Sequence, residues 1–379
     1  MSRATDPVRL AVSIGCPCGI GPEVSLAGAL AMRKKDADAR ILLVGDLGAL
    51  RAAARALQVD PGRLVRVRDP EQAWPRVPGA PGMKSRSAVP VLEPGPPLKA
   101  AERRPGHPGR AAGAAQLAWI DAAADLVAQG RADALVTGPV SKDAIARSGA
   151  KGSRGFLGHT EHLAARLAAP EVTMAFHTSY PRKRGGADSL TTSLVTTHLP
   201  LEAVARAIKP PAVARAAYWT AWLVDRLHDA RKKRAGRPRI AIAALNPHAG
   251  ERGLLGFEEE RAIAPGIALA RRRIFEAGIA VDLVGPVPAE SAFRIASEGG
   301  YDAVVAMYHD QATIPMKLLG FGEAVNVSLG LPIVRTSVDH GTAYDRAGKG
   351  TADPRGMLEA LLLAARLVRT APQRRSKIL

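Results

Sequence analysis

The chain has 379 residues, 47% of them hydrophobic, and a formal net charge of +18. This length is sufficient for two domains, each with its own core. No apolar run approaches the roughly 20 residues of a membrane-spanning helix, so we expect no membrane association. The first apolar run is too short for a secretory signal, which favours a cytoplasmic protein. The two cysteines, Cys16 and Cys18, exclude a disulfide scaffold and lack the usual zinc spacing.

Two basic clusters raise nucleic-acid binding as one interpretation of the positive charge. They occupy residues 182–184 and 231–234, the second followed by Arg237 and Arg239. Each cluster lies beside glycine or proline in a predicted connector. Aromatic residues make up only 4% of the chain, so base-stacking platforms are scarce. We therefore interpret the clusters as solvated loops and expect no nucleic-acid partner.

The first predicted unit is a strand at 10–14, a glycine-rich turn at 15–23 and a helix through Leu26 and Met32. Pro22 suits the first turn of that helix. The turn resembles a dinucleotide fingerprint, but the third glycine and a ribose-binding acid after the second strand are both missing. A standard Rossmann site is therefore not expected, although the helix start still favours anions.

Strands and helices alternate along the rest of the chain. A strand at 41–44 and a helix at 47–57 precede an irregular stretch at 60–108, which includes one short possible strand at 89–92. A helix is expected at 113–129, before a strand at 134–137. Further helices are expected near 160–169, 201–208, 211–229, 258–277, 289–298 and 355–369, and strands near 171–177, 192–197, 239–245, 280–284, 302–307 and 333–337. This order predicts an α/β fold with a largely parallel sheet.

Three of the apolar runs lead into a histidine: His198, His248 and His309. Parallel sheets gather functional groups at the carboxyl ends of their strands. Three imidazoles there can share one divalent cation and leave coordination positions open for a substrate. A single histidine that ends a strand is usually a hydrogen-bonding loop residue, so the metal interpretation depends on all three occurring in the same context.

Two further groups of residues suggest a site for an anionic substrate. His159 and Thr160 begin a predicted helix, where Thr160 can alternatively serve as the cap. Lys317, Asn326 and Arg335 offer donors suited to phosphate. The alternative is that Lys317 and Arg335 are ordinary surface cations.

An ordered set of motifs spans nearly the whole chain and is similar to that of the 4-hydroxythreonine-4-phosphate dehydrogenase family of vitamin B6 biosynthesis. The motifs are Gly-Ile-Gly-Pro-Glu at 19–23, Thr-Gly-Pro-Val-Ser-Lys at 137–142, Gly-His-Thr-Glu at 158–161, Thr-Thr-His-Leu-Pro at 196–200, Leu-Asn-Pro-His-Ala-Gly-Glu at 245–251, Gly-Pro-Val-Pro-Ala at 285–289, Tyr-His-Asp-Gln at 308–311 and Ser-Val-Asp-His-Gly-Thr-Ala at 337–343.

The resemblance implies a two-domain fold like that of the isocitrate and isopropylmalate dehydrogenases, with largely parallel central sheets. Its first, cofactor-side domain would comprise residues 1–140 and 330–379, and its second residues 141–329. It also implies a homodimer with the active site at the interface. The implied reaction is NAD- or NADP-dependent oxidation of 4-phosphooxy-L-threonine to a 3-keto acid, which decarboxylates to 3-amino-2-oxopropyl phosphate.

Residue roles follow from the same resemblance. Zinc, magnesium or cobalt would be bound by His198, His248 and His309. The phosphorylated substrate would contact His159, Thr160, Lys317, Asn326 and Arg335. The cofactor would contact His340, Gly341, Thr342, Ala343 and Gly348, and Asp310 is a candidate proton acceptor.

The chain departs from the family pattern at a few positions. Cys16 stands where the family usually has Asp or Glu, and Cys18 where it has Ala; Arg252 replaces a glycine, and residues 180–188 resemble a basic insertion. Three alternatives follow: a dehydrogenase of threonate or erythronate 4-phosphate, a dihydrodiol dehydrogenase, and a basic binding protein without catalysis. The phosphate-binding set disfavours the unphosphorylated dihydrodiol.

Overall fold

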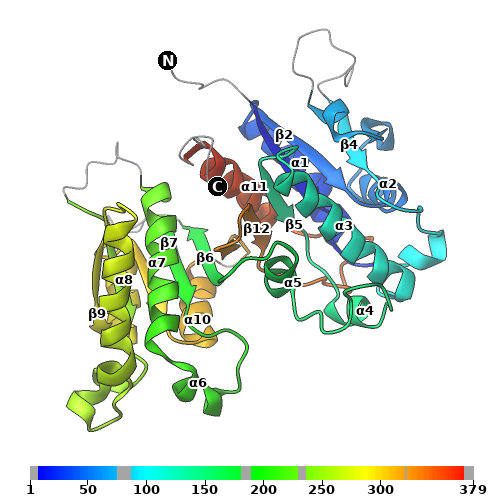
Figure 1. Ribbon diagram of the computed structural model, residues 1–379. Coiled ribbons are helices and arrows are strands. Elements are labelled where there is room, and N and C mark those ends of the chain that lie inside the picture. Colours follow the sequence, from blue (N-terminus) through cyan, green and yellow to red (C-terminus); the bar gives the residue numbers. More distant parts are fainter. Residues whose placement is uncertain (1–6, 75–86, 181–188, 229–235, 321, 371–379) are drawn as a thin grey trace. The chain divides into compact units, whose positions relative to one another are not determined.

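The computed structural model describes residues 7–74, 87–180, 189–228, 236–320 and 322–370 (Figure 1). The chain divides into two compact units, one made of 1–169 with 331–369 and the other of 170–330 with 370–379. Each unit is α/β, as the alternation of elements predicted. The basic clusters at 182–184 and 231–234 lie outside the described residues. No helix among the described residues is long and apolar enough to span a bilayer.

The first unit contains a parallel sheet in the order β3-β4-β2-β1-β5-β12. Its central strands β1 and β2 are mostly buried, and Leu10, Val12 and Leu43 are fully buried. The strands are β1 (Val8–Ser13), β2 (Ala39–Val44), β3 (Leu64–Val67), β4 (Val89–Leu92), β5 (Ala134–Thr137) and β12 (Val334–Val338).

The helices of this unit are α1 (Gly21–Lys35), α2 (Leu47–Ala56), α3 (Arg110–Ala128), α4 (Lys142–Ala146), α5 (His159–Arg166) and α11 (Arg355–Thr370), with 3-10 turns η1 (Pro61–Arg63), η2 (Pro70–Ala73) and η3 (Ala100–Arg103). The segment 141–169, assigned from sequence to the second domain, groups with the first unit. The reason is the packing of α3 on α4, where a Cβ at Gly113 would lie 1.9 Å from the carbonyl oxygen of Ala144.

The stretch 60–108 is more regular than expected, because β3 and β4 form the edge of the first sheet. The sequence signal was weak for a physical reason. Strand β3 has only four residues, two of them exposed, and Pro90 interrupts the β pattern of β4.

The second unit contains a mixed sheet in the order β11-β6-β7-β10-β8-β9. Strands β7, β10, β8 and β9 pair in parallel, while β6 runs antiparallel to both of its neighbours. The strands are β6 (Thr173–Ser179), β7 (Ser189–Leu194), β8 (Arg239–Ala243), β9 (Asp282–Val287), β10 (Ala303–Ala306) and β11 (Val325–Leu329).

The helices of the second unit are α6 (Leu201–Ala207), α7 (Pro210–Leu227), α8 (Ala264–Glu276), α9 (Ala289–Ser297) and α10 (His309–Leu319), with a 3-10 segment η4 (Pro247–Gly253) and a π-helical turn η5 (Glu259–Ile263). Helices α7 and α8 pack together (Figure 1), and Gly266 allows close contact with Val213. One core cluster joins these helices to β8 and β10, and a second joins α9 and α10 to β7 and β10. Because β10 pairs in parallel with both β7 and β8, the carboxyl ends of these three strands lie side by side.

Candidate functional site

Two of the three predicted metal-binding histidines meet in the second unit. His198 follows β7 and His309 begins α10 after β10, and their ring centroids are 5.3 Å apart. Two imidazoles that share a tetrahedral cation at about 2.0–2.1 Å from each nitrogen have centroids about 5 Å apart. In donor type and in spacing, the pair fits a divalent cation.

Side-chain hydrogen bonds hold these strand ends in place. Thr196 donates its backbone N–H and its hydroxyl to the carbonyl of Met307, at 3.1 and 2.8 Å, which joins β7 to β10. Gln311 accepts from the N–H of Met307 at 2.7 Å and donates to the carbonyl of Ala244 at 2.9 Å. One glutamine side chain therefore links the β10 end, which carries His309, to the β8 end.

His248 lies five residues beyond the end of β8, in a turn with left-handed backbone. Among the described residues, no group of three or more His, Cys, Asp and Glu side chains is placed to hold a metal ion. Within one chain, the structure thus brings together His198 and His309 but does not add His248 to them.

Asp310, the candidate proton acceptor, contacts one of the predicted ligands. Its Oδ1 lies 2.7 Å from Nδ1 of His309, and its side chain is 69% exposed. A carboxylate on Nδ1 orients an imidazole and leaves Nε2 for another partner. The contact gives Asp310 an orienting role beside the histidine pair.

The first unit encloses a cation next to a histidine. Arg335 on β12 is only 3% exposed, and its Nη2 donates to the hydroxyl of Thr137 at 2.6 Å. Burial lowers the pKa of Arg335 to about 9, which still leaves it protonated at neutral pH. Burial, and secondarily the charge of Arg335, lowers the pKa of His159 well below its usual value. His159 is therefore neutral at neutral pH.

One ring nitrogen of His159 lacks a hydrogen-bond partner. Its Nε2 is buried and has no hydrogen-bond partner among the described residues. Thr160 next to it is 5% exposed. A buried imidazole nitrogen close to a buried arginine matches a site that is completed by an anionic ligand.

Lys142 also belongs to this group and was not predicted from the sequence. Lys142 begins α4, and its charge contributes to the lowered pKa of His159. A Cβ at Gly158 would lie 3.6 Å from Nζ of Lys142 and 3.0 Å from Oε2 of Glu161, so the glycine leaves room for both groups at the start of α5. The only sequence signal was the motif at 137–142, which gave Lys142 no specific role.

The remaining predicted substrate residues, Lys317 and Asn326, belong to the second unit. Lys317 is exposed on α10, and Asn326 is half-buried on β11. The predicted substrate set is thus divided between the two units, with His159, Thr160 and Arg335 in the first.

The predicted cofactor loop follows β12 and is fastened to the glycine turn. The N–H of Ile20 donates to the carbonyl of Thr342 at 3.0 Å. The buried carboxylate of Glu23 accepts from the N–H groups of Gly348 and Gly350, at 2.5 and 3.2 Å. Nε2 of His340 is buried and has no partner among the described residues. An ordered loop with an unpartnered nitrogen fits the binding of a polar cofactor.

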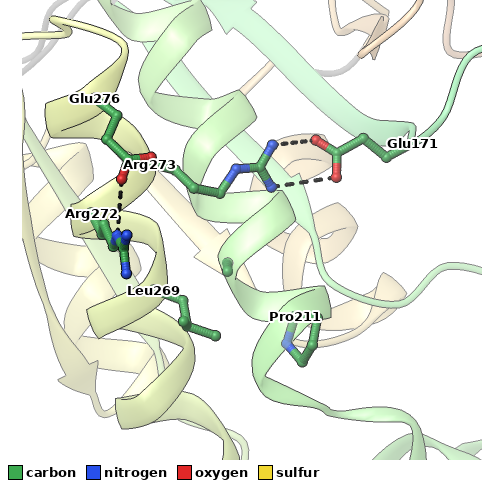
Figure 2. A pocket seen from close by; sticks show the side chains of 7 residues that line it. Glu171, Pro211, Leu269, Arg272, Arg273 and Glu276 are labelled. Atoms are coloured by element: carbon green, nitrogen blue, oxygen red, sulfur yellow. Dashed lines mark hydrogen bonds and ion pairs between the residues drawn. The ribbon is translucent and has the colours of Figure 1, made fainter.

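A separate hollow of about 380 Å³ lies between α7 and α8 (Figure 2). On one side, Arg273 forms an ion pair with Glu171, which also accepts from the indole N–H of Trp219 at 2.8 Å. None of the predicted site residues lines this hollow. We interpret it as a surface feature outside the active site.

Comparison with known proteins assigns the chain to a family. Residues 37–364 match the family model described as pyridoxal phosphate biosynthetic protein PdxA. The chain belongs to the PdxA family. The 4-hydroxythreonine-4-phosphate dehydrogenase of Geobacter metallireducens is 39% identical over 361 residues, which cover 95% of this chain and 96% of that protein.

Solved structures agree with this assignment. A 4-hydroxythreonine-4-phosphate dehydrogenase from Klebsiella pneumoniae superposes with a TM-score of 0.72 at 32% identity, covering 95% of this chain and 99% of that one. A terephthalate 1,2-cis-dihydrodiol dehydrogenase from Burkholderia xenovorans has a TM-score of 0.60 at 28% identity, covering 95% and 98%. The chain is a dehydrogenase of pyridoxal phosphate biosynthesis with the isocitrate/isopropylmalate dehydrogenase-like fold of its PdxA relatives.

Cys16, one of the positions that differ from the expected family motif, lies within the glycine turn. Its Sγ lies 3.8 Å from the hydroxyl of Tyr344, and both Cys16 and Cys18 are fully buried. Hydrogen bonding with the Cys18 thiol lowers the pKa of Cys16 to about 7, against the opposing effect of burial. Hydrogen bonding with Cys16, followed by burial, raises the pKa of Cys18. The hydrogen bond from Cys18 therefore favours the thiolate form of Cys16.

Proposed function

We propose that this chain oxidises 4-phosphooxy-L-threonine at its secondary alcohol, with NAD or NADP and a divalent cation. The product is a 3-keto acid that loses carbon dioxide to give 3-amino-2-oxopropyl phosphate. The observation that carries the proposal is the buried Arg335 close to the neutral His159, whose buried Nε2 has no partner among the described residues. A buried guanidinium and an imidazole nitrogen without a partner suit a phosphorylated substrate, and relatives at 39% identity bear the corresponding name.

Several residues are proposed to bind the phosphorylated substrate, each through a different interaction. Arg335 offers the phosphate a fork of donors, and Lys142 adds charge at the entrance of α5. Neutral His159 donates or accepts a single hydrogen bond without adding charge, and Thr160 offers a hydroxyl. Lys317 and Asn326 remain proposed contacts of the phosphorylated substrate. Binding energy at the phosphate then fixes the reacting carbon in position.

The chemical groups are proposed at the strand ends of the second unit. His198, His248 and His309 would hold zinc, magnesium or cobalt. A cation held there would supply Lewis-acid polarisation of the substrate oxygen, and a bound nicotinamide would supply the hydride acceptor. Asp310 orients His309 and is the candidate proton acceptor. The loop with His340, Gly341, Thr342, Ala343 and Gly348 is proposed to bind the adenosine half of the cofactor.

We also propose a homodimer in which a second copy completes the metal site, acting in the cytoplasm. One chain gathers two of the three histidines. Large apolar side chains near each histidine in sequence are strongly exposed: Leu201 73%, Leu254 79% and Leu318 81%. Such apolar exposure is typical of a surface that another protein covers.

Reduction of the cofactor by purified protein tests the proposal. NADH formation is expected with 4-phosphooxy-L-threonine and zinc, cobalt or magnesium, and EDTA is expected to abolish it. A panel with threonate 4-phosphate, erythronate 4-phosphate and an unphosphorylated cis-dihydrodiol separates the alternative substrates.

Higher turnover on another phosphorylated acid would reassign the substrate. Activity that survives thorough metal removal would contradict the metal role. Tight nucleic-acid binding at physiological salt without cofactor reduction would favour the basic binding protein.

A further inference from the structure

The turn that carries His248 has an unusual backbone. Residues 248–252 all have positive φ, with values of 51°, 56°, 78°, 44° and 56°. Only Gly250 among them lacks a Cβ, so the other four residues occupy a conformation that L-amino acids rarely adopt. A run of this kind persists only where its surroundings hold it in place.

The carboxylate of Glu259 provides that support. Its Oε1 accepts from the backbone N–H groups of Leu245 and Asn246, at 2.9 and 2.8 Å, and its Oε2 accepts from Nδ2 of Asn246 at 3.0 Å. A Cβ at Gly250 would lie 2.7 Å from Oε2, so the carboxylate packs directly against the turn. One side chain thus holds the turn at its entrance and contacts its middle.

The position of Glu259 distinguishes it from its neighbours. It is 4% exposed and begins the π-helical turn η5, whereas the next residue, Glu260, is exposed. Glu258 adds one contact, accepting from Nδ2 of Asn246 at 2.8 Å. A buried carboxylate that accepts three hydrogen bonds from one loop costs desolvation, which its contacts with the turn offset.

We propose that Glu259 is a positioning residue that holds the left-handed turn so that His248 is presented to the divalent cation. This inference rests on the proposed role of His248 as a metal ligand. If Glu259 loses its charge, the strained turn relaxes and the histidine is no longer pre-positioned. Loss of an outer hydrogen-bond partner of a ligand typically weakens metal affinity by about 10–100-fold.

The test is cobalt binding to the metal-free, full-length protein, measured by calorimetry and by visible absorption. Glu259→Gln keeps the size of the side chain but sets an amide N–H₂ against a donor, either Asn246 Nδ2 or the backbone. Its affinity for Co²⁺ is expected to fall by about 10–100-fold. At saturating Co²⁺ its absorption spectrum is expected to match that of the wild type, because the ligands are unchanged. Glu260→Gln is the matched control, and its affinity is expected to be unchanged.

Two further variants make the outcome decisive. His248→Ala is expected to weaken Co²⁺ binding and to change the spectrum; wild-type binding by this variant would refute the proposed ligand role and the inference with it. If His248→Ala weakens binding but Glu259→Gln does not, the inference is overturned and the proposed function survives. If Glu259→Gln does not fold, Asn246→Ala, which removes only the side-chain contact, replaces it with an expected loss of about tenfold. Unchanged affinity in that folded variant would equally overturn the inference.

Discussion

At the scale of single residues, substitution of Arg335 tests the proposed phosphate binding most directly. Arg335→Lys keeps a positive charge but loses the planar fork and its bond to Thr137. We expect the KM for the phosphorylated substrate to rise about 10–100-fold, the effect of losing one or two hydrogen bonds to a charged group. Steady-state kinetics with varied substrate provides the measurement. Arg294→Lys, at an exposed position of α9, should leave the KM unchanged, and an unchanged KM in Arg335→Lys would remove the arginine from the site.

Cys16 leads to a prediction about pH and stability. Its pKa is lowered from 9.0 to about 7 in the folded chain, so its ionisation stabilises the fold most above pH 9 and this contribution is lost as the pH falls through 7. The raised pKa of Cys18 destabilises the fold, but only above pH 9, where this thiol would ionise in the unfolded chain. Between pH 7 and 9, the unfolding free energy of the wild type should therefore rise relative to Cys16→Ser by about 1–3 kcal/mol. Urea unfolding at several pH values checks this, and parallel curves for the two proteins would show that Cys16 does not ionise in this range.

At the scale of elements, Gln311 is the side chain that joins two strand ends. Gln311→Met preserves size but leaves the N–H of Met307 and the carbonyl of Ala244 without this partner. We expect a loss of about 1–3 kcal/mol in unfolding free energy. Gln311→Glu keeps an oxygen that accepts from the N–H of Met307. It should lose the bond to the carbonyl of Ala244, because a carboxylate cannot donate and is repelled by that oxygen. If Gln311→Met unfolds at the same urea concentration as the wild type, the two strand ends are held by backbone pairing alone.

The sequence predicted the elements whose signals are local and repeated. Buried runs such as 41–44 and 134–137 became strands of the first sheet, and the alternation of elements correctly indicated a largely parallel α/β fold. The sequence also indicated that His198 and His309 lie at neighbouring strand ends. In the structure their ring centroids are 5.3 Å apart. Strand β11 was missed because its short run follows closely on α10, whose internal Pro315 obscures the helical pattern.

What the sequence did not predict depends on contacts between distant segments. The left-handed turn at 248–252 has one glycine among five residues, so nothing local indicates it. Glu258, Glu259 and Glu260 are identical in type, so the sequence does not single out Glu259. Its role becomes visible only in the fold, where η5 packs against the residues that follow β8. Lys142 and Glu23 likewise acquire roles through partners far along the chain. Burial, which distinguishes these residues, is a property of the fold.

At the scale of the whole molecule, the distribution of histidines leads to a test of the dimer. The described part of one chain does not gather three metal ligands, so we expect the complete site to use residues of two chains. Single alanine variants of His198, His248 and His309 should each be inactive. In a dimer with shared sites, two inactive variants whose missing ligands come from different chains form hybrids with one intact site.

Pairwise mixing of the three variants, by co-expression with two different affinity tags, makes this measurable. Random pairing yields hybrids for half of the dimers, and one intact site in each hybrid restores up to about a quarter of wild-type activity. At least one of the three pairings should reach this range, and each variant paired with itself should remain inactive. The pairing that regains activity also identifies which histidine is supplied by the partner. If all three pairings stay inactive while wild-type chains treated in the same way are active, each metal site is built within a single chain.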